Sequence, residues 1–243
     1  MMTETHTPVR QIVFDTETTG MNQDAGPHYL GHKLIEIGCV EMIDRKITGK
    51  NYHVFIKPDR AVDEEAIEVH GITDEFLVDK PMFHEVIEDF LAFVKGAELI
   101  AHNASFDTGF INYELELLGR KDTIEDHCVI TDTLQLAREK KSKGEIQGNL
   151  NLDALCRFYG IDNSHRTLHG ALLDSEILAD VYLFMTGGQK ALELASGADG
   201  DNGGIIRLDS SRRPLKVIRA GADDIERHHK RMELVSDPIW MRE

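Results

Sequence analysis

The chain has 243 residues, and its 43 acidic side chains outnumber 27 basic ones, which gives a formal net charge of −16. This length accommodates one substantial domain with an appendage, or two small domains. No apolar run approaches the roughly 20 residues that span a bilayer, and the first thirty residues lack the apolar core of a signal peptide. Three cysteines without a CxxC pair (Cys39, Cys128 and Cys156) argue against disulfide bonds and zinc sites. We therefore expect a cytoplasmic protein with no membrane segment.

The negative charge is concentrated in the first part of the chain. Residues 1–186 contain 33 acidic and 17 basic side chains, whereas residues 187–243 contain ten of each. A strongly acidic domain lacks the positive surface by which most nucleic-acid-binding proteins hold their ligand. The composition therefore argues against a free-standing protein that binds nucleic acid with high affinity.

The chain begins with three predicted strands, at Gln11–Glu17, Leu34–Ile43 and Ile47–Ile56. The segment Asp44–Lys46 is short enough for a hairpin, so this opening predicts an antiparallel three-strand meander. Helical and strand patterns then alternate along the chain. We predict a helix over residues 83–94, a strand at Glu98–Ala101, a helix over 106–117, a strand at His127–Ile130, and helices at Thr131–Lys140, Asn151–Tyr159 and about Gly170–Met185. This order predicts an α/β domain, residues 1–186, with a mixed sheet flanked by helices.

The composition changes after residue 186. The Gly- and Asp-rich segment Ala195–Gly204 is typical of a flexible linker. Beyond it, a short amphipathic stretch around Ile225 is too small to fold alone. We therefore expect a flexible C-terminal tail, with residues 187–212 as a connection and residues 213–243 as a segment that docks on another protein.

Two acidic residues, Asp15 and Glu17, end the first predicted strand. Side chains two apart in a strand point to the same face, so both carboxylates lie together. Carboxylates on a packed face need a partner, and a metal cation is the simplest one. A solvated strand end remains the alternative at this point.

A second polar segment, His102 to Asp107, follows a buried strand and opens a helix. Asp107 near a helix N-terminus is electrostatically favourable. On its own this segment is equally explained by helix capping through Asn103 or Ser105.

The third segment contains His169 and Asp174. Five residues rotate a helix by about 140°, so these side chains cannot share a face of one regular helix. We infer that His169 lies just before the helix or in a distorted first turn, with Asp174 one turn inside. A single histidine in this position is more often a hydrogen-bond partner than a catalyst.

Together the three segments carry a family resemblance. The sequences FDTETTG (14–20), HNASFD (102–107) and LHGALLD (168–174) resemble the three motifs of the DEDDh, or DnaQ-like, 3′→5′ exonucleases, a branch of the RNase H-like fold. The resemblance covers nearly the whole chain, including NLDALC (151–156), and is closest to the ε proofreading subunits of bacterial DNA polymerase III. It implies a bacterial, replisome-associated DNA exonuclease that releases nucleoside 5′-monophosphates.

The resemblance also implies a catalytic set that agrees with the chemistry of the side chains. Hard carboxylate oxygens suit two Mg²⁺ or Mn²⁺ ions that clamp the attacking and leaving oxygens of a phosphodiester. The resemblance makes metal ligands of the four carboxylates and a general base of His169. The expected ligands are Asp15, Glu17, Asp107 and Asp174.

Residues that contact the substrate are implied in the same way. Besides Asp15, Glu17 and Asp174, they are Thr18, Glu65, His70, His102 and Phe106, with Glu65 on a predicted helix. A turn residue before Gly71 is the alternative for His70, and a core residue is the alternative for Phe106.

The tail carries weaker signals for partners. Gln189, Leu192 and Leu194 resemble the short peptide by which replication proteins bind a sliding clamp. Residues 213–243 resemble the segment that binds the polymerase catalytic subunit. A small accessory subunit on the exonuclease domain is a further expected partner, and His228-His229 is expected to be solvated helix surface.

Besides a generic acidic metal-binding module, which would explain the carboxylates but leave His169 without a role, two rival functions stay open at this stage. One is another DEDDh enzyme, an exoribonuclease of the oligoribonuclease or tRNA-trimming type, which would have no use for a docking tail. The other is a non-catalytic bridge between clamp and polymerase, which would have no need of five intact catalytic positions.

Overall fold

The computed structural model describes residues 9–164, 166, 168–187 and 221–232. The chain divides into two compact units, Met1–Lys190 and Ala191–Glu243. The predicted clamp peptide, the predicted linker and most of the predicted docking segment lie outside the described residues. Among the residues that are described, no helix is long and apolar enough to cross a membrane.

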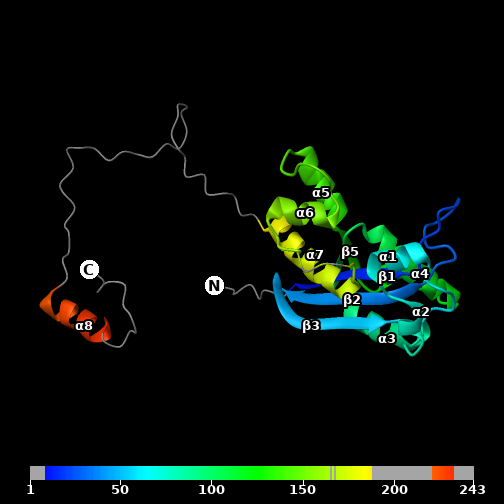
Figure 1. The fold of residues 1–243 in the computed structure, drawn as a ribbon, viewed down its shortest axis with the longest axis horizontal. Coiled ribbons are helices and arrows are strands. Elements are labelled where there is room, and N and C mark those ends of the chain that lie inside the picture. Colours follow the sequence, from blue (N-terminus) through cyan, green and yellow to red (C-terminus); the bar gives the residue numbers. More distant parts are fainter. Residues whose placement is uncertain (1–8, 165, 167, 188–220, 233–243) are drawn as a thin grey trace, which may run out of the picture. The chain divides into compact units, whose positions relative to one another are not determined.

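The first unit is built on a five-stranded mixed sheet (Figure 1). Its strands are β1 (Arg10–Thr18), β2 (Leu34–Ile43), β3 (Lys46–Phe55), β4 (Glu98–Ala101) and β5 (Val129–Asp132), in the order β3-β2-β1-β4-β5. The first three strands are antiparallel, and β4 and β5 continue the sheet parallel to β1. The predicted meander and mixed sheet are confirmed.

Helices cover both faces of this sheet. They are α1 (Glu64–His70), α2 (Asp74–Leu77), α3 (Phe83–Val94), α4 (Ala104–Leu117), a 3-10 turn η1 (Ile124–Asp126), α5 (Thr133–Ser142), α6 (Leu152–Tyr159) and α7 (Ala171–Thr186). The elements α2 and η1 were not predicted, because they are too short to show a helical period.

One predicted strand is displaced. The prediction placed it at His127–Ile130, whereas β5 begins and ends two residues later. Its register is set by pairing with β4, where Ala101 lies opposite Asp132. The Asp132 side chain then accepts a hydrogen bond from the backbone of Leu134 at 2.8 Å, which starts α5.

The alternation of β1 sorts its side chains between two cores. Ile12 and Phe14 pack with α3 and α4 on one face, while Val13 packs with α7 on the other. Because side chains in a strand alternate between its two faces, Asp15 and Glu17 point to the same face as Val13, the face that α7 covers. Figure 1 shows α7 lying along the sheet over β1 and β2, which brings its first turn to the end of β1.

A glycine in β2 allows this close packing. Gly38 pairs with Asp15 across the two antiparallel strands, so the two positions face the same side. A Cβ atom on Gly38 would lie 2.2 Å from the backbone nitrogen of Leu172 in α7. The Ser175 hydroxyl also donates to the Gly38 carbonyl at 2.9 Å. The backbone of α7 therefore rests directly on the sheet beside Asp15.

We predict that Gly38→Ala lowers the free energy of unfolding by about 1–3 kcal/mol or more, because α7 backbone cannot rotate away as a side chain can. Thermal and denaturant unfolding of the full chain measure this effect. Gly170→Ala, where a Cβ would meet nothing within 4 Å, is the matched control and should change stability little. Equal stability of both variants would show that α7 is not held against Gly38.

The described part of the second unit is one helix, α8 (Ala222–Met232). Residues 222–231 of this helix are exposed, including Ile225 at 48%. Acidic residues occupy its first turn and basic residues its last turn, which suits the helix dipole. The exposure of His228 and His229 agrees with the solvated surface predicted for them.

Candidate active site

The four predicted carboxylates and His169 line one cavity of about 300 Å³ at the end of β1. Asp15 and Glu17 come from β1, Asp107 from the first turn of α4, and Asp174 from the first turn of α7. The structure therefore brings together groups that are up to 159 positions apart in the chain, and each comes from an element terminus.

Burial and mutual repulsion disfavour the ionised forms of the carboxylates on β1. Desolvation, followed by the charges of Asp107, Glu17 and Asp174, raises the pKa of Asp15 well above its usual range. Glu17 is also buried, and it lies opposite Glu36 on β2. Desolvation and then the Glu36 charge raise the pKa of Glu17 to about 8.

Asp107 is buried, and it is hydrogen-bonded to β1 on the face of the sheet that α4 covers. Its Oδ1 accepts a hydrogen bond of 2.7 Å from the Thr16 hydroxyl. Burial nevertheless raises the pKa of Asp107 to about 7. The capping alternative does not hold for Asn103, since it precedes α4 in a left-handed conformation (φ 69°) and its side chain makes no cap hydrogen bond.

His169 lies outside the regular helix, as the rotation argument predicts. It precedes Gly170, the residue before α7, and its backbone N–H donates to the Val69 carbonyl at 3.1 Å. Asp174 lies one turn inside, where its backbone N–H bonds to the Gly170 carbonyl at 2.8 Å. His169 remains exposed, whereas the Asp174 side chain is buried.

Arg166 is a charged residue of the site that the sequence reasoning missed. Its guanidinium donates to both oxygens of Asp174 at 2.5 Å and to Asp153 Oδ1 on α6 at 2.8 Å. Burial alone would raise the pKa of Asp174, but hydrogen bonds and charges from His169 and Arg166 lower it. The only available signal was a basic residue three positions before His169, which does not reveal its carboxylate partners.

Arg166 also determines how the His169 ring can act. His169 Nδ1 lies 2.8 Å from Nη2 of Arg166 and 3.3 Å from Asp174 Oδ2. The guanidinium always donates, so the shorter contact requires a lone pair on Nδ1 and leaves the proton of a neutral ring on Nε2. The longer contact requires the proton on Nδ1 and leaves Nε2 free as a base. These two arrangements exclude each other.

A second cavity of about 290 Å³ adjoins the carboxylates and shares Glu17 and Phe106 with them. The predicted substrate residues Thr18, Glu65 and His70 line it. Phe106 forms the wall between both cavities and stacks on His28 with ring centroids 4.8 Å apart. Phe106 also packs against the core, as the alternative of a core residue predicts, while its place in both cavity walls leaves the predicted substrate contact open.

His70 contributes to this cavity as a wall rather than through its nitrogens. Nδ1 accepts from the Ile72 backbone N–H at 3.0 Å, so Nε2 carries the proton and donates to the Thr18 carbonyl at 3.2 Å. Burial lowers the pKa of this ring, which keeps it neutral. His70 thereby fixes the end of β1.

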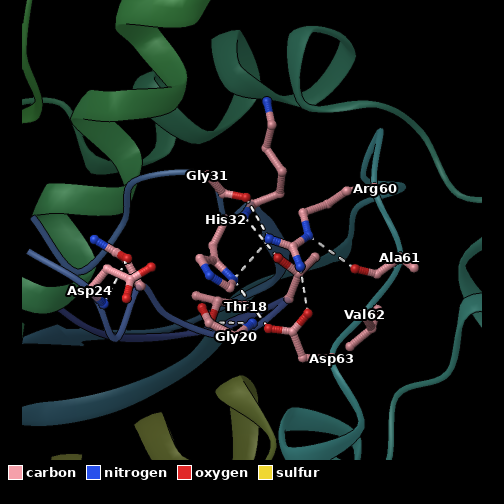
Figure 2. A network of polar contacts seen from close by, with 12 residues as sticks. Thr18, Gly20, Asp24, Gly31, His32, Arg60, Ala61, Val62 and Asp63 are labelled. Atoms are coloured by element: carbon pink, nitrogen blue, oxygen red, sulfur yellow. Dashed lines mark hydrogen bonds and ion pairs between the residues drawn. The ribbon is translucent and has the colours of Figure 1, made fainter.

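A polar network around Arg60 (Figure 2) includes Gly20 and Asp63, which line the second cavity. Arg60 donates to the Gly31 carbonyl at 2.5 Å, to the Ala61 carbonyl at 3.1 Å, and to the Asp63 carboxylate. Gly20 faces the same carboxylate at φ +128°, and a Cβ there would lie 2.4 Å from Asp63 Oδ2. The network joins the loop after β1 to the segment before α1.

The donor set fits hard divalent cations. Four carboxylates converge, and Glu17, His169 and Asp174 each offer one ligand atom within 4.8 Å of the others. Carboxylate oxygens are preferred by Mg²⁺, Mn²⁺ and Ca²⁺, and a cation offsets the repulsion that raises the pKa values on β1. His102 lines the same cavity, but its Nδ1 is bonded to the Thr133 hydroxyl at 2.9 Å.

Known proteins that resemble this chain agree with the geometry of the site and define the class of protein to which the fold belongs. The family described as Exonuclease matches residues 12–182. The nuclease domain of 3′hExo, a DEDDh family member bound to rAMP, has a TM-score of 0.57 at 16% identity, over 75% of this chain and 92% of that one. The fold is thus that of the RNase H-like DEDDh exonucleases.

Closer relatives define the particular family. DNA polymerase III subunit epsilon of Pasteurella multocida is 53% identical over 234 residues, which cover 93% of this chain and 89% of that protein. The subunit of Escherichia coli strain K12 is 52% identical over 232 residues, covering 93% of each chain. This chain therefore belongs to the ε-subunit family of DnaQ-like 3′→5′ exonucleases, and the family implies divalent metal ions.

We predict that stability falls as pH rises from 6.5 to 8 in the presence of EDTA. Glu17 and Asp107 hold protons up to pH about 8 and 7 when folded, but release them near pH 4 when unfolded. The stability from this protonation is complete below pH 4 and is lost as pH rises through 7–8. Denaturant unfolding at several pH values measures the slope.

In Glu17→Gln the slope should be less steep by up to about 1.4 kcal/mol per pH unit. The exposed Glu176→Gln on α7 is the control and should keep the wild-type slope. A Glu17→Gln slope equal to that of the wild type would contradict the assigned protonation.

Proposed function

We propose that this chain removes nucleotides from the 3′ end of DNA by hydrolysis with two Mg²⁺ or Mn²⁺ ions, and proofreads as part of DNA polymerase III. The observation that supports it most is the single cavity in which four carboxylates and His169 meet. The relatives at 52–53% identity are named DNA polymerase III subunit epsilon, and this chain matches them over nearly their whole length.

In this proposal each side chain has a distinct task. Asp15, Glu17, Asp107 and Asp174 would hold the ions, which when bound would supply an activated water and offset charge on the departing 3′ oxygen. His169 accepts the proton of the attacking water through Nε2, the nitrogen on the side away from Asp174. This requires the arrangement in which Nδ1–H faces Asp174, so Arg166 must release Nδ1 and can keep its bond to Asp153.

The second cavity is proposed to receive the 3′-terminal nucleotide. Glu65 is exposed there and free to accept a hydrogen bond from a sugar hydroxyl, whereas His70 offers its ring face. Phe106 offers an aromatic surface, on which bases stack without sequence preference. A proofreading enzyme needs such tolerance, because any nucleotide can be misincorporated.

Asp15→Ala should abolish 3′→5′ digestion of a mismatched primer, and His169→Gln should slow it by roughly 10²–10⁴, as expected for loss of a general base. Hydrolysis of the p-nitrophenyl ester of thymidine 5′-monophosphate with Mn²⁺ measures the chemistry alone. Glu176→Ala, exposed on α7, is the control and should behave as the wild type. Near wild-type rates in Asp15→Ala would sink the metal-ligand assignment, and preferential digestion of RNA would favour the exoribonuclease alternative.

The proposed partners lie along the tail. Residues 213–243 bind the polymerase catalytic subunit, and Gln189, Leu192 and Leu194 bind the sliding clamp. The exposed α8, with Ile225 at 48% exposure, supports a helix that buries its apolar side only on a partner. A small accessory subunit would bind the exonuclease domain, residues 1–186.

We predict that chemistry and recruitment separate near residue 187. A chain of residues 1–186 should hydrolyse the mononucleotide ester like the full chain but should not co-elute with the polymerase in gel filtration. Gln189→Ala with Leu192→Ala should weaken clamp binding without changing ester hydrolysis. Equally tight polymerase binding by residues 1–186 would show that the tail is not the docking segment. A full chain that binds the polymerase but does not hydrolyse the ester would favour the non-catalytic bridge.

A further inference from the structure

A third cavity, of about 490 Å³, adjoins the carboxylates on the side of α5. Its lining residues are His102, Leu134, Arg138, Asn149, Leu150 and Asn151. It shares His102 with the carboxylate cavity, which in turn shares Glu17 and Phe106 with the cavity beside Glu65. The three cavities therefore form a row, with the carboxylates in the middle.

The third cavity contains an arginine that has no ionic partner within the described part of the chain. Arg138 is exposed on α5 and has no hydrogen bond or ion pair with any described residue. Five other arginines of the first unit, by contrast, donate to carboxylates or carbonyl groups; they are Arg10, Arg45, Arg60, Arg120 and Arg166. In a domain of net charge −16, an unpaired guanidinium beside the reaction site is available for an anion.

The surroundings of Arg138 suit a nucleic-acid backbone. Leu134 and Leu150 supply partly buried apolar surface, and the Asn149 amide is exposed beside them. His102, at the boundary with the carboxylates, is fixed by the Thr133 hydroxyl at 2.9 Å. A cation for phosphate next to apolar surface for sugar and base is the usual composition of a single-strand groove.

We propose that this third cavity binds the DNA strand on the 5′ side of the scissile bond, with Arg138 contacting the phosphate that precedes the scissile one. The inference rests on the proposed function, because placing the terminal nucleotide beside Glu65 fixes the direction of the strand. The scissile phosphate then lies at the carboxylates, and the chain of nucleotides continues past His102 to Arg138. Arg138 is a binding residue and does not take part in the chemistry.

Substrates of increasing length test this assignment on the full-length chain. The p-nitrophenyl ester of thymidine 5′-monophosphate and the dinucleotide dT2 each contain only the phosphate that is cleaved. The trinucleotide dT3 adds one phosphate on the 5′ side, at the position assigned to Arg138. Arg138→Ala should leave kcat/KM for the ester and dT2 unchanged and lower it for dT3 by about 5- to 20-fold, through KM.

Two further variants separate a specific contact from a general change in charge. Arg157 on α6 is also exposed, without a partner among the described residues, and lines none of the three cavities, so Arg157→Ala is the matched control. Arg157→Ala should act as the wild type on dT3, and Arg138→Lys should recover part of the loss. The slope of log kcat/KM against log salt for dT3 should become shallower by about 1 in Arg138→Ala only.

The possible outcomes distinguish the subsite from the function on which it rests. If the wild type digests dT3 and Arg138→Ala matches it, the subsite is wrong and the proposed function stands. Equal losses in Arg138→Ala and Arg157→Ala, or an equal loss on the ester, also overturn the subsite. A wild type that hydrolyses neither the ester nor dT3 with Mn²⁺ overturns the proposed function together with the subsite.

Discussion

The structure is organised around the repulsion between carboxyl groups at the end of β1. Asp15 and Glu17 lie on the same side of this strand. Asp107 accepts a hydrogen bond from Thr16, the residue between these two in the chain, and Asp174 reaches the same cavity from α7. Burial adds to the repulsion, so three of these four groups have raised pKa values. Such an arrangement costs stability, and it is relieved by positive charge placed at the same oxygens.

Several features of the fold serve to hold these groups despite their repulsion. Gly38 lets α7 rest on the sheet, so Asp174 cannot move away from Asp15 without loss of packing. His70 bonds the end of β1 through the Thr18 carbonyl, and the Arg60 network ties the loop that follows. Among the described residues that line the cavity, Arg166 is the only arginine or lysine, and it reaches both Asp174 and His169. The site is therefore pre-organised by rigid elements rather than by loops alone.

Arg166 and Arg138 represent two uses of positive charge in an acidic domain. Arg166 is buried and engaged with Asp153, Asp174 and His169, so it acts on the geometry of the site. Arg138 is exposed and unpaired among the described residues, so it can act on a ligand. Because acidic side chains outnumber basic ones 33 to 17 in residues 1–186, we expect affinity for DNA to depend on few contacts and on the partners proposed for the tail.

The placement of the candidate site residues was predictable from sequence where the signals are local. A period of two placed Asp15 and Glu17 together, and a helical angle excluded His169 from the face of Asp174. The motif resemblance then grouped distant segments that periodicity alone cannot connect.

What could not be predicted depends on tertiary contacts. Nothing near Arg166 in the chain indicates that it meets Asp174, and nothing near His70 shows that both its nitrogens bond to backbone. The bounds predicted for β5 were wrong by two residues, because the strand is placed by its pairing with β4 and not by the apolar run around Ile130. The interaction segments of the tail stay predictions.

The central claim is that crowded carboxyl groups hold protons until divalent ions replace them. Isothermal titration calorimetry of the full chain with Mn²⁺ at pH 7, in buffers of different ionisation enthalpy, tests it directly. We predict two bound ions per chain and a net release of protons on binding, because burial raises the pKa of Glu17 to about 8 and that of Asp107 to about 7. Binding without proton release, or a stoichiometry of zero, would contradict it.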